Sequence, residues 1–314
     1  MYLSPVSIGG QKFNFDLDTG SSDLWVFSNK LPASIQRKHK SNGGKIYTPG
    51  PTAKNANGLT WSITYVDNSG ASGTVVTDNV KIGGITVKKQ AVEVASRISA
   101  MFEDFEGDGL LVSPTKQQTW FENAMSQLQS KLFTADLNQQ SAGSYGWGYI
   151  NSIYSKKIAY AKIRNTGWWH VDAGGGIRVN GKLTTTGASY TAGAVPDTGT
   201  TLLLLPNSLV KLYYASVPKA QYSSEAGAWV YPCTPQGFPN LPPLSIPVGK
   251  SWATIPGKYL TYAYANSAGT SCFGGLQGLS DSSDLPFIYG DIFFKANFAV
   301  FDYGNKRFGF AQKR

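Results

Sequence analysis

The stretch "DLDTGSSDLWVF", residues 16–27, has a near copy in "PDTGTTLLLLP", residues 196–206. Each copy holds an Asp-Thr-Gly turn, then a hydroxyl residue, and then an apolar run. Asp197 lies 179 residues after Asp18, since 197 minus 18 is 179. Each copy predicts a strand, a tight turn and a second strand, so we expect a duplicated architecture.

Composition indicates a mainly β protein with two lobes. At 314 residues and 41% hydrophobic content, the chain is long enough for a large core and two domains. Its 35 glycines and 16 prolines punctuate short runs rich in β-branched and aromatic residues, which favours strands. Helical spacing is found only at 120–130 and 206–217. The apolar run "TLLLLP" at 201–206 has the length of a buried strand.

Several functional classes lack support in the sequence. No apolar run approaches the roughly 20 residues of a membrane span. The first residues do not join a basic segment to an apolar one, so we expect no signal peptide in this sequence. The net charge of +9 comes from basic residues beside turns, without a nucleic-acid-binding motif, so we expect solvated loops and no nucleic-acid partner.

Other catalytic chemistry is also unsupported. The two histidines, His39 and His170, form no H-E-x-x-H pair, and G-x-S-x-G is absent. We therefore expect neither a metal nor another cofactor. The two cysteines, Cys233 and Cys272, form either one disulfide or two buried thiols.

The two Asp-Thr-Gly turns together suggest acid–base chemistry. Two carboxylates held close together cannot both ionise, so they share one proton, and aspartic proteases are the known example of such a pair. One group can then deprotonate a water while the other protonates a carbonyl oxygen. Gly20 and Gly199 permit sharp turns beside a ligand, and Ser21 and Thr200 can hydrogen-bond the carboxylates.

Two further motifs identify a family. "WSITYVDNSGASG" at 61–73 has the pattern of a hairpin flap, and "FIYGDIFFKANFAVFDYGNKRFGFA" at 287–311 that of a C-terminal signature. With the paired turns, they make the chain resemble the pepsin-like aspartic proteases, closest to the fungal secreted type, over nearly its whole length. The resemblance implies a bilobal β fold with a pseudo-twofold axis and a central cleft in which Asp18 and Asp197 meet.

The resemblance also implies roles for individual residues. Trp25 holds the flap tyrosine, Tyr65, by a hydrogen bond, while Tyr65, Asp67 and Thr201 contact substrate. Cys233 and Cys272 form the second-lobe disulfide, which implies an extracellular or secretory location. We expect an N-terminal lobe at 1–160, with Asp18 and the flap, and a C-terminal lobe at 161–314, with Asp197 and the disulfide.

Three features depart from the family pattern. Each lobe of the family has a hydrophobic-hydrophobic-Gly turn, which the second lobe keeps as "IYG" at 288–290, but the first reads "LLV" at 110–112. Val112 therefore takes a glycine's place, and Val66 replaces the usual flap-tip glycine. The family's first strand is nearly absent before "YLSPVSIGG". The basic charge also contrasts with fungal relatives, which are usually acidic.

The leading functional prediction is an aspartic endopeptidase. It would be a monomer that binds an extended peptide or protein substrate and has no membrane partner. One alternative is a pepsin-fold enzyme whose acid–base pair acts on a small non-peptide substrate. Another is a pseudoprotease that binds without cleaving. The intact turns favour an enzyme, whereas Val66 and Val112 favour a departure from ordinary proteolysis.

Overall fold

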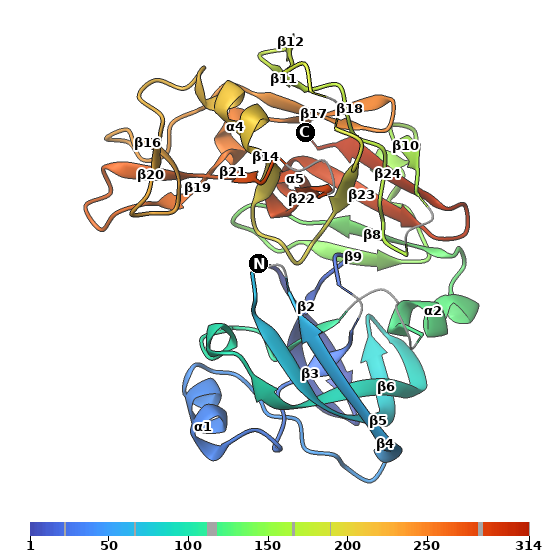
Figure 1. Ribbon diagram of the computed structural model, residues 1–314. Coiled ribbons are helices and arrows are strands. Elements are labelled where there is room, and N and C mark those ends of the chain that lie inside the picture. Colours follow the sequence, from blue (N-terminus) through green and yellow to red (C-terminus); the bar gives the residue numbers. More distant parts are fainter. Residues whose placement is uncertain are drawn as a thin grey trace. The chain divides into compact units, whose positions relative to one another are not determined.

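The chain consists of two compact units, residues 1–128 (unit 1) and 129–314 (unit 2). The computed structural model describes residues 1–21, 23–65, 67–111, 118–164, 167–188, 190–281 and 285–313. Both units are built mainly from strands (Figure 1), and the predicted mainly β, two-lobed fold is confirmed. The division at 128/129 differs from the expected boundary at 160/161, because the strand at Leu132–Asp136 pairs with the strand at Asn297–Asp302 near the C-terminus.

Unit 1 contains one seven-stranded sheet in the order β1-β2-β7-β3-β6-β5-β4. Parallel pairing of β2 with β7, and antiparallel pairing of β7 with β3, places the end of β2 inside the sheet. The antiparallel β4–β5 hairpin contains residues 61–73, the segment that we predicted as the flap. The strand bounds are β1 Leu3–Ile8, β2 Gln11–Leu17, β3 Trp25–Val26, β4 Lys54–Thr64, β5 Gly70–Ile82, β6 Ile85–Ile98 and β7 Gly109–Leu111.

Aromatic rings fill the core of unit 1 beneath the flap. Trp25 is fully buried, and its ring centroid lies 5.3 Å from that of Phe27 and 5.1 Å from that of Phe102. Trp61, in the flap strand β4, stacks on Trp25 at 6.1 Å. Burial of such rings stabilises a fold by roughly 1.5–3 kcal/mol per side chain, so this cluster fixes β3 and the base of the hairpin together.

The helices of unit 1 surround this core, and two of their residues, His39 and Phe102, pack on its rings. These helices are α1 Ala33–Ser41 and α2 Trp120–Ala124, with 3-10 turns η1 Ala100–Phe102 and η2 Met125–Gln127. A capping box formed by Thr119 and Glu122 begins α2. The helix predicted at 120–130 is thus shorter than expected, since a 3-10 turn replaces its second half and Leu128 is extended.

The described residues of unit 2 form four sheets. The five-stranded sheet has the order β10-β24-β23-β8-β9, and a four-stranded sheet has the order β12-β11-β17-β18. These strands are β8 Leu132–Asp136, β9 Ser144–Trp147, β10 Ala159–Lys162, β23 Asn297–Asp302, β24 Arg307–Gln312, β11 Ile177–Val179, β12 Lys182–Thr184, β17 Leu244–Val248 and β18 Ser251–Ile255.

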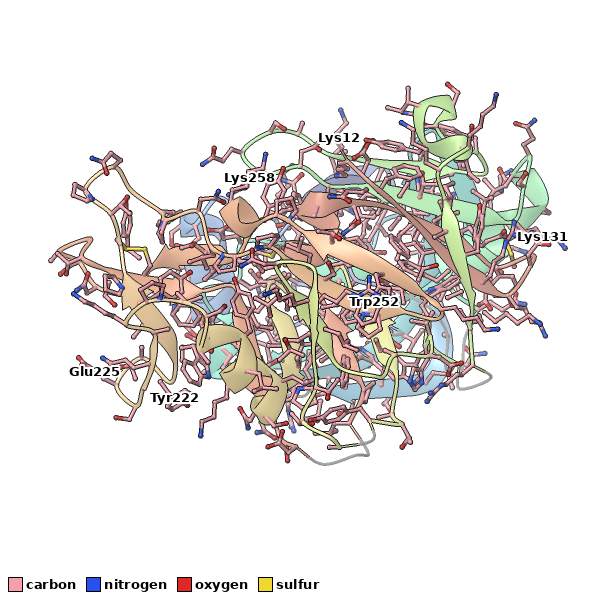
Figure 2. The ribbon with its side chains drawn as sticks, turned by 90° about the horizontal axis from the view of Figure 1, so that it is seen from above. Lys12, Lys131, Tyr222, Glu225, Trp252 and Lys258 are labelled. Atoms are coloured by element: carbon pink, nitrogen blue, oxygen red, sulfur yellow. A yellow bond between two sulfur atoms is a disulfide. The ribbon has the colours of Figure 1, made fainter. Side chains whose placement is uncertain are left out.

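Two more four-stranded sheets carry the second Asp-Thr-Gly turn and the cysteines. They have the orders β13-β22-β14-β21 and β15-β16-β20-β19. Their strands are β13 Ala194–Pro196, β14 Leu203–Pro206, β21 Leu276–Leu279, β22 Phe287–Tyr289, β15 Gln221–Ser223, β16 Ala228–Pro232, β19 Thr261–Tyr264 and β20 Ser271–Gly274. A disulfide joins Cys233 to Cys272, with Cα atoms 5.2 Å apart, as predicted (Figure 2).

Short helices cover the sheets of unit 2: α3 Ser152–Ser155, α4 Asn207–Tyr214 and α5 Asp291–Ala296, with the 3-10 turn η3 Gly257–Tyr259. The predicted helix at 206–217 corresponds to α4, which packs on β14 and β21. The predicted buried strand is β14, whose Leu203 and Leu205 are fully buried. None of the helices in the described ranges has the length and apolar character that crossing a membrane requires.

Candidate active site

The first Asp-Thr-Gly turn follows β2 and holds a buried carboxylate. Asp18 is 6% exposed. The Gly20 amide donates to Asp18 Oδ1 at 2.7 Å, and the Ser21 hydroxyl donates to Asp18 Oδ2. One donor on each oxygen fixes the plane of the carboxylate and offsets part of the cost of its burial.

The second turn follows β13 and repeats this arrangement. Asp197 is 9% exposed. The Gly199 amide donates to Asp197 Oδ1 at 2.9 Å, and the Thr200 hydroxyl donates to Oδ2 at 2.6 Å. Serine and threonine thus supply the same donor at the same place. The role that the sequence predicted for Ser21 and Thr200, hydrogen bonding to the carboxylates, matches this geometry.

The strands around the two turns pair in the same pattern in both units. Leu17, just before Asp18, pairs with Leu111 in parallel, and Pro196, just before Asp197, pairs with Tyr289 in parallel. A third strand, β3 in unit 1 and β14 in unit 2, pairs in antiparallel fashion with β7 and β22, respectively. Its pairs are Trp25↔Leu110 in unit 1 and Leu204↔Ile288 in unit 2. The duplication therefore extends from sequence to strand pairing, and each carboxylate follows a strand that pairs with a parallel neighbour.

Tyr65, which follows β4 in the flap, is hydrogen-bonded to Trp25 in β3. The Trp25 indole N–H donates to the Tyr65 hydroxyl at 2.9 Å, as the resemblance implied. The Tyr65 ring also packs edge-on against Phe102, with centroids 5.6 Å apart. Burial raises the pKa of Tyr65; the Trp25 hydrogen bond lowers it, and the charges of Asp18 and Asp23 raise it further. Tyr65 therefore stays a neutral hydroxyl group beside the Asp18 turn.

The tip of the flap is a tight turn that Asp67 helps to close. The Tyr65 amide donates to the Ser69 carbonyl at 2.8 Å, and the Ser69 amide donates to the Asp67 carboxylate at 2.9 Å. Asn68 has a positive φ of 64°, which this short connection requires. Asp67 itself is exposed, so its carboxylate is accessible from outside the turn. Val66 lies outside the described residues.

The backbone of Gly290 packs closely against the residues that follow the second turn. A Cβ atom at this position would lie 2.2 Å from the carbonyl oxygens of Thr200 and Leu202, so no side chain fits. The next amide, that of Asp291, donates to the Thr200 carbonyl at 2.7 Å. Thr201 is half-buried between this turn and β14. Position 112 of unit 1 corresponds to Gly290 by register, but Val112 lies outside the described residues.

Glu93, in β6, is a feature of this site that sequence reasoning missed. It pairs in parallel register with Trp25. Burial raises the pKa of Glu93 to about 9, and the charge of Asp23 and a hydrogen bond with it raise the pKa as well. Glu93 is therefore a neutral acid at the pH of most assays. No sequence signal marks it, because the shift depends on a tertiary contact with Asp23.

Comparison of the sequence with known proteins identifies a family. The family model described as eukaryotic aspartyl protease matches residues 1–313. Penicillopepsin-3 of Penicillium janthinellum is 40% identical, and aspergillopepsin-1 of Aspergillus fumigatus is 42% identical; each alignment covers 99% of this chain and 78% of the relative. Aspartic endopeptidase PEP1 of Trichophyton verrucosum is 39% identical over 99% of this chain and 79% of its own length. The chain therefore belongs to the eukaryotic aspartyl protease family, a family of aspartic endopeptidases.

Proposed function

We propose that Asp18 and Asp197 act as one catalytic pair in the hydrolysis of peptide bonds. The observation that carries the proposal is the matched donor set of the two turns. In each turn, a glycine amide donates a hydrogen bond to Oδ1 of the aspartate, and a hydroxyl group donates to Oδ2. A turn that served only the fold would need no such duplication of contacts to a buried carboxylate.

The proposed reaction uses one proton shared by the two carboxyl groups. The ionised carboxylate takes a proton from water as the water oxygen attacks the scissile carbonyl carbon. The protonated carboxyl group gives its proton to the carbonyl oxygen, which yields a tetrahedral diol. When the C–N bond breaks, the amine nitrogen takes the proton that came from water, and the shared proton returns to the pair. No covalent enzyme intermediate is formed.

Ser21 and Thr200 are positioning residues in this scheme, and Gly20 and Gly199 supply amide donors without side chains in the way. Tyr65, Asp67 and Thr201 are proposed to contact an extended peptide that binds as an added strand. Trp25 acts through Tyr65, because its indole N–H holds the tyrosine hydroxyl.

The disulfide supports an extracellular or secretory location for the protein, since disulfides persist in oxidising compartments. We propose that the active form is a monomer. Light scattering on the purified chain measures the oligomeric state directly.

Cleavage of an unfolded protein at pH 3 to 6 tests the proposed function. We expect turnover that a statine-type transition-state mimic stops. Binding of the mimic without any turnover would instead identify a pseudoprotease. Absence of both, with Asp18 and Asp197 required for a reaction on a small molecule, would identify a repurposed enzyme.

A further inference from the structure

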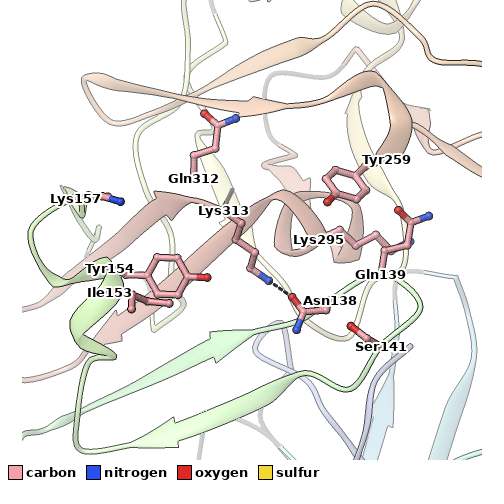
Figure 3. Close-up of a pocket in the computed structure, with 10 residues that line it drawn as sticks. All are labelled: Asn138, Gln139, Ser141, Ile153, Tyr154, Lys157, Tyr259, Lys295, Gln312 and Lys313. Carbon is pink, nitrogen blue, oxygen red and sulfur yellow. Dashed lines mark hydrogen bonds between the residues drawn. The ribbon is translucent and has the colours of Figure 1, made fainter.

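Unit 2 contains a cavity that the proposed catalytic residues do not line. Its volume is about 550 Å³, within the usual range of small-molecule sites. The side chains of Lys157, Lys295 and Lys313 reach it from three different elements (Figure 3): the turn after α3, the last turn of α5 and the end of β24. None of the residues that line it is acidic.

Lys313 is a fixed part of the cavity wall. Its side chain is 8% exposed, and its ammonium group lies 2.7 Å from Asp136 Oδ1. The same group donates to the Leu137 carbonyl at 2.7 Å and to Asn138 Oδ1 at 3.3 Å. Lys313 therefore neutralises the half-buried carboxylate of Asp136, which leaves no excess negative charge beside the cavity.

Lys295 and Lys157 differ from Lys313, because no carboxylate among the described residues forms an ion pair with either of them. Among the described residues, neither ammonium group has a hydrogen-bond partner or a carboxylate within ion-pair distance. Burial lowers the pKa of Lys295, and the charge of Asp291, one turn earlier in α5, partly offsets this effect. Lys295 is half-buried, so it lacks full hydration as well as a partner. An anion in the cavity would supply what these two groups lack.

The hydroxyl group of Tyr259 adds a neutral donor. Tyr154 and Tyr259 both line the cavity. Burial, the charge of Asp136 and a hydrogen bond to that carboxylate raise the pKa of Tyr154, so the Tyr154 hydroxyl is already engaged by Asp136. Lys258 (labelled in Figure 2) lies over the Tyr259 ring, 4.9 Å from its centroid, and so brings a further cation next to a residue that lines the cavity.

We propose that this cavity binds a small oxyanion that carries two or more negative charges, of the diphosphate or polycarboxylate type. Lys295 and Lys157 would pair with its charged oxygens, and the Tyr259 hydroxyl would donate to a remaining one. A ligand with several charges spread over several atoms fits two ammonium groups on separate elements better than a single carboxylate does.

Isothermal titration calorimetry at pH 6 and constant ionic strength tests this site. Inorganic pyrophosphate and citrate serve as the two probes, with acetate as the monovalent control. We expect one saturable site for at least one probe, and about tenfold weaker binding after Lys295→Gln or Lys157→Gln. Lys182→Gln and Lys211→Gln change exposed lysines of unit 2 outside the cavity and should alter the affinity less than twofold.

The result overturns the proposal if neither probe binds, or if the control variants weaken binding as much as the cavity variants do. The second outcome would show attraction to the overall charge of +9 and not to a site. Lys157 is exposed, so its variant tests the site even if Lys295→Gln disturbs α5. A preference for pyrophosphate over citrate, or the reverse, distinguishes the two kinds of ligand. Because the readout is binding, it does not depend on peptidase activity.

Discussion

The two Asp-Thr-Gly turns have the same hydrogen-bond pattern but different surroundings. Asp18 and Asp197 each accept one amide and one hydroxyl hydrogen bond, at the end of strands with matching registers. The position seven residues after each aspartate, however, holds Trp25 in unit 1 and Leu204 in unit 2. Trp25 holds the flap tyrosine, whereas Leu204 lies in a buried apolar strand. The shared contacts are those that the proposed acid–base chemistry requires, whereas the side chain seven residues later differs between the two units.

Two further pairs of equivalent positions differ. Trp25 pairs with Glu93, and the equivalent Leu204 pairs with Gln277, so an acid in unit 1 corresponds to an amide in unit 2. In the sequence, Val112 corresponds to Gly290. The two units therefore carry different residues at these equivalent positions, although each keeps its aspartate.

Gly290→Val should have the largest effect on stability. A Cβ at 2.2 Å from two carbonyl oxygens forces the backbone behind Asp197 to move, which we expect to cost more than about 4 kcal/mol of unfolding free energy. Denaturant unfolding measures this loss. Gly50→Val is the control, since a Cβ there meets no atom within 4 Å. Equal stability of the two variants would mean that position 290 tolerates the valine found at 112.

Ser21→Ala and Thr200→Val should lower kcat/KM by similar factors. Each removes one hydroxyl donor to a carboxylate, and a hydrogen bond to a charged group contributes about 1.5–3 kcal/mol, or roughly 10- to 100-fold. Peptidase kinetics on one substrate measures both. A large loss in only one variant would show that the two turns, despite their matched geometry, do not contribute equally.

Glu93→Gln should change how stability depends on pH. Between pH 5 and 9 the folded state keeps the Glu93 proton, because its pKa is about 9, whereas the unfolded state releases it. Stability therefore falls as pH rises, by at most about 1.4 kcal/mol per pH unit. Glutamine gives unit 1 the amide that unit 2 has at Gln277, and it should flatten this slope. Melting temperatures of both proteins at pH 4 and pH 8 measure the difference. An unchanged slope would show that Glu93 does not cause the decline.

Local sequence patterns predicted the parts of the site that repeat or carry strong turn chemistry. The two turns, the buried strand β14 and the hydroxyl donors follow from residue type and spacing. The Trp25–Tyr65 hydrogen bond and the disulfide needed the family resemblance, since their partners are far apart in sequence.

Features held by tertiary contacts could not be predicted. Helix α1 has no side-chain cap and only one buried residue, His39, so it shows no apolar face. Lys38 pairs with Glu103 and Asp104 at 3.3 and 3.0 Å, and His39 lies 3.2 Å from Asp108. These partners come 65 or more residues later, beyond the reach of a local pattern. The raised pKa of Glu93 and the lysine-lined cavity have the same kind of origin.

The most direct test of the account compares Asp18→Asn, Asp197→Asn and the double variant in kcat/KM on an unfolded protein substrate. If the two carboxyl groups act as one unit, each single variant loses at least about 10³-fold while its melting temperature is kept, and the double variant loses little more. Near-normal activity in either single variant, or single losses that multiply in the double variant, would contradict a shared-proton pair.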